Sequence, residues 1–423
     1  MAVRKFNLLD NPFITGPIIP NELFCDREME TAKLYGYIAN GNNVVLKSAR
    51  RIGKTSLIHH LFQVPEIAKN YNTILVDLYQ TKNLQGLVTR FSRALLEAPF
   101  ARTQRGLKSL TDAIPEIKLF AQLNAGPVTA GMEAIYKTRY ETTLDTIFDF
   151  LKKSDKRNLV VFDEFQTIED YDDTKVSAML RSGIQSLTNT EFIFSGSEKH
   201  MLASMFLDRN KPFYKSALQM EIDVIPYEAY RAFCRKMFKS KQRDITDDAI
   251  DLTYHLFTAN TFEMQTVMNL TFSFTAKGQT ANVNDVKLII ENIISENESA
   301  YREIFNSAKT EKESNFFLCL GIEGIASALT SEKMIGKYML GGASSVQNTI
   351  KKYSKEDPQT NKKAIIEEIG NKNYKLMDKF FELWIAQNTG RLEEKYATAR
   401  ERFSKEQTIR KAVPKLILPP SLQ

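Results

Sequence analysis

One short run constrains this 423-residue chain more than any other part of its sequence: Ser48-Ala49-Arg50-Arg51-Ile52-Gly53-Lys54-Thr55-Ser56. The apolar residues 43–47 before the run predict a buried strand, and residues 55–62 predict a helix. A strand, a loop ending in Gly-Lys-Thr and a helix are the context in which a phosphate-binding P-loop occurs. We therefore predict a P-loop between this strand and this helix.

The residue types of the loop suit a triphosphate, whose dense negative charge needs many donors at close range. Backbone N–H groups of a tight loop supply such donors, and the following helix adds its positive end. Gly53 lets the backbone approach the phosphates, Lys54 reaches the β and γ oxygens, and the Thr55 hydroxyl ligates Mg²⁺. Ser48 replaces the glycine that usually opens the motif, and serine often tolerates turn geometry. The expected ligands are ATP or ADP and Mg²⁺.

Two later apolar runs end in polar residues. Residues 159–162 predict a central strand that leads into Asp163 and Glu164, at the edge of an open α/β sheet where ligands bind. Asp163 is expected to hold Mg²⁺ through water, and Glu164 to orient and polarise the attacking water. The strand 191–195 ends in small hydroxyl residues, which either form a plain turn or place a polar group near the γ-phosphate: Ser195 or Ser197.

The pattern changes at Pro226. Before it, helices alternate with strands, which indicates an α/β fold with a parallel, doubly wound sheet. The strands are expected at residues 43–47, 72–79, 159–162, 191–195 and 220–225, and the helices at 55–62, 87–97, 142–153 and 176–187, with helix and loops over 101–131. After Pro226 we predict only helices, with no strand between them, at 228–240, 247–256, 263–274 and 286–305. A charged linker, 307–313, leads to a compact stretch, 315–387.

The compact stretch contains a helix-turn-helix pattern followed by a hairpin. Residues 331–338 and 345–353 predict two helices on either side of a turn with Gly341 and Gly342. Residues 364–369 and 374–377 alternate in polarity around a Gly-Asn-Lys-Asn turn, which predicts a β-hairpin and hence a wing. The order of these elements fits a winged helix.

Positive charge is concentrated near the C-terminus. Residues 351–423 hold 16 Lys and Arg against 10 Asp and Glu, so they carry all of the chain's +6 excess. This asymmetry favours a polyanion partner, and a solvated lysine-rich surface is the alternative. Amides on the second helix can read base edges while lysines hold DNA phosphates: Gln347, Asn348, Lys351 and Lys352. Lysines of the wing can add backbone contacts: Lys355, Lys362, Lys363, Lys372 and Lys375.

Together these motifs resemble the AAA+ ATPases called archaeal-type ATPases, close to the origin-recognition and signal-transduction (STAND) branches. The resemblance covers residues 11–384 and rests on several segments: Asn11-Pro12-Phe13, Phe24-Cys25-Asp26-Arg27-Glu28-Met29-Glu30, the paired Arg50 and Arg51, Asp163-Glu164-Phe165-Gln166, Leu180-Arg181 with Gln185, and Phe194-Ser195-Gly196-Ser197. It implies an AAA+ core at residues 1–225, a helical lid at 226–310, a winged helix at 311–387 and a charged helical tail at 388–423. It also implies that Phe24 and Arg27 lie beside the adenine.

The chain departs from the family pattern at two places. Family members often carry an arginine where this chain has Ser216, so the group that acts as arginine finger is open. The candidates to replace it are Arg181, Arg209 and Lys215. Asn260-Thr261-Phe262 stands where the lid usually has Gly-x-Pro, and we find no second-sensor arginine there. We therefore expect slow ATP hydrolysis and, if the chain forms a homo-oligomer, a finger from a neighbouring copy.

Three functions remain on sequence grounds. The first is a nucleotide-driven switch that binds duplex DNA through the winged helix. The second is a regulatory or defence-type ATPase that scaffolds a protein partner, as in the STAND branch, and Glu367, Glu368, Glu393 and Glu394 dilute the basic face in its favour. The third, a P-loop kinase, lacks an arginine-rich acceptor lid. Three separated cysteines, no leader pattern and no apolar run long enough for a bilayer predict a cytoplasmic protein without a membrane partner.

Overall fold

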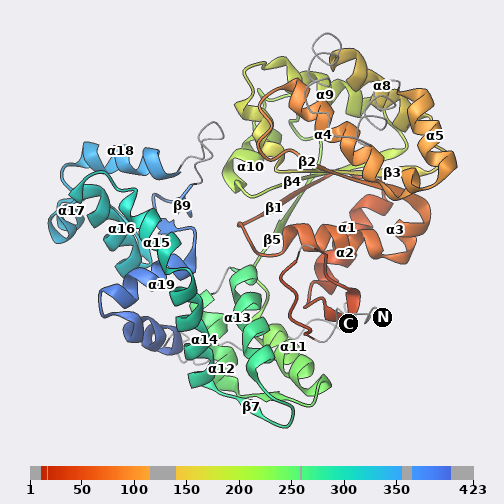
Figure 1. Ribbon diagram of the computed structural model, residues 1–423. Coiled ribbons are helices and arrows are strands. Elements are labelled where there is room, and N and C mark those ends of the chain that lie inside the picture. The colour runs from red at the N-terminus through yellow and green to blue at the C-terminus, as the bar shows by residue number, and fades with distance from the viewer. Residues whose placement is uncertain (1–10, 17, 115–139, 258–259, 355–363, 402–423) are drawn as a thin grey trace, which may run out of the picture. The chain divides into compact units, whose positions relative to one another are not determined.

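A computed structural model describes residues 11–16, 18–114, 140–257, 260–354 and 364–401 (Figure 1). The chain divides into two compact units. The core unit is Gly16–Ile225, and the C-terminal unit combines Met1–Thr15 with Pro226–Gln423. The chain therefore passes between the units twice, after Thr15 and after Ile225.

The core unit is built on a five-stranded sheet with the order β2-β3-β4-β1-β5. All neighbouring strands are parallel. The strands are β1 (Val44–Ser48), β2 (Tyr71–Asp77), β3 (Arg157–Asp163), β4 (Thr190–Gly196) and β5 (Leu218–Ile222). β3 and β4 are buried almost throughout, as strands covered on both faces must be. The predicted α/β class and parallel sheet are confirmed.

Helices cover both faces of this sheet (Figure 1). One face packs against α1 (Glu28–Ala39), α2 (Lys54–Gln63) and α3 (Pro65–Asn70), with Leu34, Leu57 and Ile67 fully buried. The other face packs against α4 (Leu84–Glu97), α5 (Gln104–Ala113), α8 (Tyr140–Lys152), α9 (Lys175–Gln185) and α10 (Lys199–Leu207). Short 3-10 turns complete the unit: η1 (Asn21–Leu23), η2 (Pro99–Arg102) and η3 (Phe165–Asp170).

The predicted core helices are present, but among the described residues of the core three helices were not predicted. They are α1, α3 and α10. α1 contributes only Thr31, Leu34 and Ile38 to the interior, so its apolar pattern is weak. The helix with loops predicted at 101–131 is found as η2 and α5, and its remainder lies outside the described residues.

The first part of the C-terminal unit is helical, as predicted, with two differences. Its helices are α11 (Tyr227–Ser240), α12 (Asp247–Phe257), α13 (Thr261–Phe274), α14 (Val283–Glu296) and α15 (Glu298–Asn306). The prediction of a single helix at 286–305 was wrong, because Asn297 interrupts the helix and separates α14 from α15. The expected absence of strands was also wrong, because β6 (Asp244–Ile245) and β7 (Thr280–Ala281) pair in parallel. Strands of two residues are too short to give a periodic pattern.

The second part of this unit has the predicted helix-turn-helix and hairpin. Its elements are α16 (Glu311–Glu323), β8 (Ile325–Ala326), α17 (Glu332–Tyr338), α18 (Ala343–Ser354), β9 (Ile366–Glu368), β10 (Tyr374–Leu376) and α19 (Lys379–Asn388). β9 and β10 form the hairpin, and β8 joins it in the order β8-β10-β9. Residues 392–401 are helical. The predicted linker 307–313 runs into α16, which begins at Glu311 with Thr310 as its N-cap.

The N-terminal segment is anchored to α11 and α13. Phe13 has no exposed surface, and its ring packs against Phe233, Phe238 and Phe272 at centroid distances of 5.7, 5.5 and 5.9 Å. Asn269 Nδ2 donates to the Phe13 carbonyl at 2.6 Å. The sequence grouped residues 1–15 with the core, whereas these contacts join the Asn-Pro-Phe segment to the lid helices.

We expect the Phe13→Ala variant to loosen the lid helices. Removing a fully buried phenylalanine costs about 3–5 kcal/mol, which should lower the first melting transition in scanning calorimetry by several degrees. Ile18→Ala is the matched control, because Ile18 is 62% exposed in the segment that follows. Equal melting curves for the two variants would show that the Phe13 contacts do not stabilise the unit.

Candidate nucleotide site and winged helix

The predicted phosphate- and magnesium-binding residues of the core lie at one edge of the sheet. Ser48 ends β1, Asp163 ends β3 and Gly196 ends β4. The carboxyl ends of these parallel strands point the same way, so the P-loop, the two carboxylates and the serines meet there. Ligands of open α/β sheets bind at this edge.

The loop has the backbone shape that its sequence predicts. Gly53 is the N-cap of α2 with a φ of +89°, and Arg51 also has a positive φ of +63°. Only glycine adopts such values without steric cost. Ser48 and Ile52 are buried, and the Ser48 hydroxyl donates to the Ala49 carbonyl at 3.0 Å. Arg50 Nη2 lies 4.0 Å from Glu198 Oε1. Ser56 is half-buried in the first turn of α2.

Lys54 lies between two carboxylates. Its Nζ is 3.1 Å from Asp163 Oδ1 and 3.3 Å from Glu164 Oε1, and its side chain is only 8% exposed. Thr55 Oγ1 donates to Asp163 Oδ2 at 3.2 Å. A hydroxyl and a carboxylate oxygen are the hard donors that Mg²⁺ prefers. The donor set therefore fits a magnesium ion, and the buried ammonium fits phosphate oxygens.

The surroundings of Asp163 favour its charged form although the residue is buried. Burial alone would raise its pKa, but the Lys54 ammonium and hydrogen bonds from Ser195 Oγ (2.8 Å) and Glu164 N (3.1 Å) outweigh it, so the pKa lies below its ordinary value. The Ser195 hydroxyl thus stabilises the Asp163 carboxylate. The other serine of this strand end, Ser197, serves Glu164, because its Oγ and N donate to Glu164 Oε2 at 2.9 and 3.3 Å.

Gln166 belongs to the site, although the sequence assigned it no role beyond its place in the family motif Asp163-Glu164-Phe165-Gln166. Its Nε2 donates to Glu164 Oε2 at 2.5 Å. Its position two residues after Glu164 was the available signal. Glu164 itself has a positive φ of +52°, which turns the chain sharply from β3 into η3.

The three candidates for an arginine finger lie apart from this cluster. With its amide oxygen turned toward the guanidinium, Gln185 accepts from Arg181 Nη2 at 2.6 Å. Lys215 lies over the Tyr214 ring, and Arg209 is exposed. Across the described ranges, none of the three makes a hydrogen bond or ion pair with Lys54, Asp163 or Glu164. The assignment of an arginine finger to one of these residues stays a prediction.

The two residues expected beside the adenine differ in their surroundings. Phe24 stacks on His60 with ring centroids 4.2 Å apart and keeps part of its surface exposed. Arg27 is 3% exposed and donates to the carbonyls of Asp223 (2.6 Å) and Ile52 (3.4 Å). Its guanidinium thereby joins the end of the P-loop to the chain that follows β5. This geometry holds the loop in place rather than offering donors to a base.

The predicted DNA residues divide into exposed and engaged side chains. Gln347, Asn348 and Lys351 are exposed on α18. Lys352 Nζ lies 2.6 Å from Glu313 Oε1 and over the Tyr353 ring, so its charge is neutralised within the unit. On the wing, Lys372 is exposed at the hairpin turn and Lys375 pairs with Glu367 at 2.9 Å. Lys355, Lys362 and Lys363 lie outside the described residues.

Most of the C-terminal charge excess belongs to segments outside the described residues. Residues 355–363 and 402–423 hold eight of the sixteen basic groups but only three of the ten acidic ones. The described residues between 351 and 401 hold eight basic and seven acidic groups and are nearly balanced. The described surface of the winged helix is therefore less basic than the sequence count suggests.

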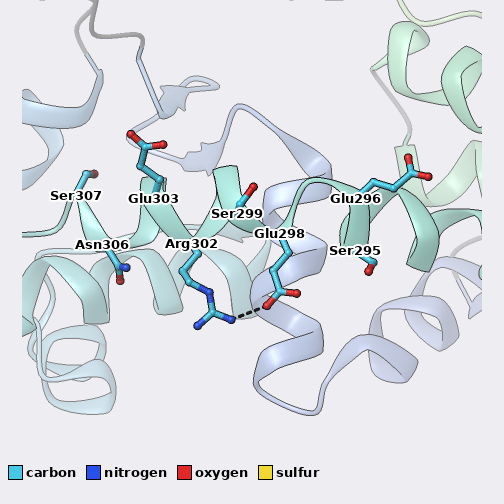
Figure 2. A pocket seen from close by; sticks show the side chains of 8 residues that line it. All are labelled: Ser295, Glu296, Glu298, Ser299, Arg302, Glu303, Asn306 and Ser307. Carbon is cyan, nitrogen blue, oxygen red and sulfur yellow. Dashed lines mark hydrogen bonds and ion pairs between the residues drawn. The ribbon is translucent and has the colours of Figure 1, made fainter.

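A surface hollow on the C-terminal unit is lined by the end of α14 and by α15 (Figure 2). Its charged side chains include Glu296, Glu298 and Glu303, and Arg302 pairs with Glu298 at 2.5 Å. All of them are exposed, and Figure 2 shows that they point in different directions. The hollow therefore lacks the convergent buried groups that the P-loop edge has.

The fold and the site are those of a P-loop ATPase of the AAA+ class. Residues 24–266 match the family described as an ATPase domain predominantly from Archaea, and the chain belongs to this family. Residues 299–387 match a probable winged helix domain. No curated protein matches the chain in sequence. Among the described residues, no helix is long and apolar enough to cross a membrane.

Many solved structures match the fold, among them two at low sequence identity. A Walker-type ATPase of Pyrococcus abyssi is 16% identical with a TM-score of 0.58, and the match covers 88% of this chain and 99% of that one. The ORC2 protein of Aeropyrum pernix is 12% identical with a TM-score of 0.50, and the match covers 92% and 98%. Both are similar in fold to this chain over nearly their whole length.

We expect the Lys54→Ala variant to lose ATP binding. Truncating a buried charged partner costs enough to weaken affinity on the order of a hundredfold. Calorimetric titration with ATP and Mg²⁺ measures this, with Lys33→Ala, an exposed lysine of α1, as the matched control. An unchanged affinity of the Lys54 variant would refute the assignment of the P-loop.

Proposed function

We propose that this protein is an ATP-binding molecular switch that hydrolyses ATP slowly. The observation that carries the proposal is the buried Lys54 ammonium between Asp163 and Glu164, at the edge where the P-loop ends. The family and the shared fold support nucleotide use in general. The three cysteines are free and buried, which suits a cytoplasmic location.

The chain's own residues divide the work of hydrolysis. The loop 48–53 and Lys54 bind and orient the phosphates of ATP through backbone N–H groups and one ammonium. Thr55 and Asp163 would hold Mg²⁺, which neutralises charge on phosphate oxygens when bound. Glu164 accepts a hydrogen bond from the water that attacks the γ-phosphorus while the bond to the β-phosphate oxygen breaks and ADP leaves; one proton of the water stays on the released phosphate and the other passes by way of Glu164 to solvent.

Slow turnover follows from two features of the site. The Lys54 ammonium pairs with Glu164 Oε1 at 3.3 Å, so this oxygen is shared between the lysine and any attacking water. Ser216 stands where the family often has an arginine, and its hydroxyl donates to the Phe213 carbonyl. A neighbouring copy in a homo-oligomer would be the source of a finger.

We expect the Glu164→Gln variant to bind ATP but to lose turnover. The amide keeps the shape of the side chain yet polarises water less than the carboxylate, so kcat should fall at least about a hundredfold. Phosphate release and ATP affinity are to be measured together. If a neighbour supplies the finger, the wild-type rate per chain should rise with protein concentration. A Glu164→Gln rate equal to that of the wild type would exclude Glu164 as the catalytic residue.

Duplex DNA is the partner that we propose for the winged helix. The exposed face of α18 presents two amides and one lysine, a set that can read base edges and hold a phosphate: Gln347, Asn348 and Lys351. Lys372 at the wing turn can add a second phosphate contact. The switch would bind DNA differently with ATP and with ADP.

A protein partner is the second candidate, and a specific observation favours it. Met339, in the turn before α18, is 68% exposed, and Ile369, at the end of β9, is 43% exposed. Lys352 and Lys375 are neutralised by glutamates. Exposed apolar side chains and lysines that are already paired suit a protein surface better than a phosphate backbone.

The two partners differ in their response to salt. For DNA, log K should fall with log salt by about 0.9 per phosphate contact on B-DNA. We expect Lys351→Ala to flatten this slope by roughly one contact, and Lys352→Ala to flatten it less because its ammonium is held by Glu313. Replacing Gln347 and Asn348 should relax sequence preference with little change in slope. Absence of salt-sensitive DNA binding with either nucleotide would favour the protein partner.

A further inference from the structure

Gln166 is a buried amide that the proposed reaction leaves without a role. It lies in η3, and only 4% of its surface is exposed. Its Nε2 donates to Glu164 Oε2, whereas its Oε1 is buried and accepts no hydrogen bond from any residue that the structure describes. A buried polar atom without a partner is destabilising. The reason for burying this amide therefore has to lie in the hydrogen bond from its Nε2 to Glu164.

Gly196 leaves the space that this amide occupies. A Cβ at position 196 would lie 2.0 Å from Gln166 Oε1 and 3.1 Å from its Cδ. Gly196 is not among the glycines with positive φ, so a side chain there is excluded by space and not by backbone conformation. Two strand ends, those of β3 and β4, thus cooperate to place the Gln166 amide beside Glu164.

The two oxygens of Glu164 have different surroundings. Oε2 accepts from three donors: Gln166 Nε2, Ser197 Oγ and Ser197 N. A carboxylate oxygen has about two lone-pair sites, so Oε2 has no site left for a water. Oε1 lies 3.3 Å from Lys54 Nζ, on the side of the P-loop lysine. Only Oε1 is therefore suited to accept a hydrogen bond from the attacking water.

We propose that Gln166 is a positioning residue that fixes the rotation of the Glu164 carboxylate, so that Oε1 faces the phosphate-binding loop. The last torsion of a glutamate side chain has a broad energy profile, and hydrogen bonds therefore decide its value. In this proposal Gln166 acts through Glu164, to which its Nε2 donates. The proposal rests on ATP hydrolysis at this site, as proposed above, and adds a residue that sets its rate.

The test is a kinetic comparison of two variants that disturb the amide from different strands. Gln166→Met keeps the length of the side chain but removes the donor, and Gly196→Ala pushes the amide away. Each should lower kcat about tenfold to a hundredfold, the effect of one hydrogen bond to a charged group. The dissociation constant of ATP should stay near the wild-type value in both variants, and the melting temperature should stay near it in Gln166→Met, whereas the added methyl of Gly196→Ala is expected to lower the melting temperature. Gln63→Met is the matched control, because Gln63 is exposed at the end of α2.

A double variant separates positioning from a general structural effect. In the Glu164→Gln background, Gln166→Met should cause no further loss in single-turnover assays, because both changes act on the same group. A Gln166→Met rate equal to wild type, a matching loss of ATP affinity, or a further loss in the double variant would each overturn the proposal. A wild-type protein without any ATP turnover would instead overturn the proposed function, and the role of Gln166 with it.

Discussion

The structure depends on one ammonium group held between two carboxylates. Lys54 begins α2, Asp163 ends β3 and Glu164 follows it, so the contact joins segments more than 100 residues apart. Two carboxylates near one buried ammonium leave an excess of negative charge, which burial makes costly. Hydrogen bonds from Thr55, Ser195 and Ser197 reduce that cost. The parallel sheet places the ends of β1 and β3 at one edge and so brings these groups together.

The sequence predicts the parts of the site that obey simple rules. A loop with Gly-Lys-Thr after an apolar strand, and an apolar run ending in two acids, each combine a motif with a structural context. Their meeting at one sheet edge then follows from parallel topology. The sequence does not predict which hydroxyl serves which carboxylate, because Ser195 and Ser197 are two residues apart on one strand end. That division depends on side-chain packing around Glu164 and Gln166.

Long-range contacts account for most of what the sequence missed. Arg27 lies in a segment expected beside the adenine, yet its guanidinium bonds to the carbonyl of Asp223, 196 residues away. Phe13 packs into the helices α11 and α13, which no local pattern reveals. The count of charges near the C-terminus also overstated the basic character of the winged helix, because Lys352 is neutralised by Glu313 from another helix. Helices with a clear apolar stripe, such as α4, were predicted because the spacing of their own apolar residues indicates which face is buried.

The lid helices and the winged helix belong to one compact unit. Glu263 of α13 accepts from the Lys379 backbone N–H at the start of α19, at 3.0 Å, and Phe257 packs on Phe380 at 5.1 Å. These contacts join α12 and α13 to α19 within the unit. The most direct test of the account is a crystal structure of the Glu164→Gln variant with ATP and Mg²⁺. We predict a γ-phosphate oxygen within hydrogen-bonding distance of Lys54 Nζ; a triphosphate bound elsewhere, with Lys54 still paired to Asp163, would contradict it.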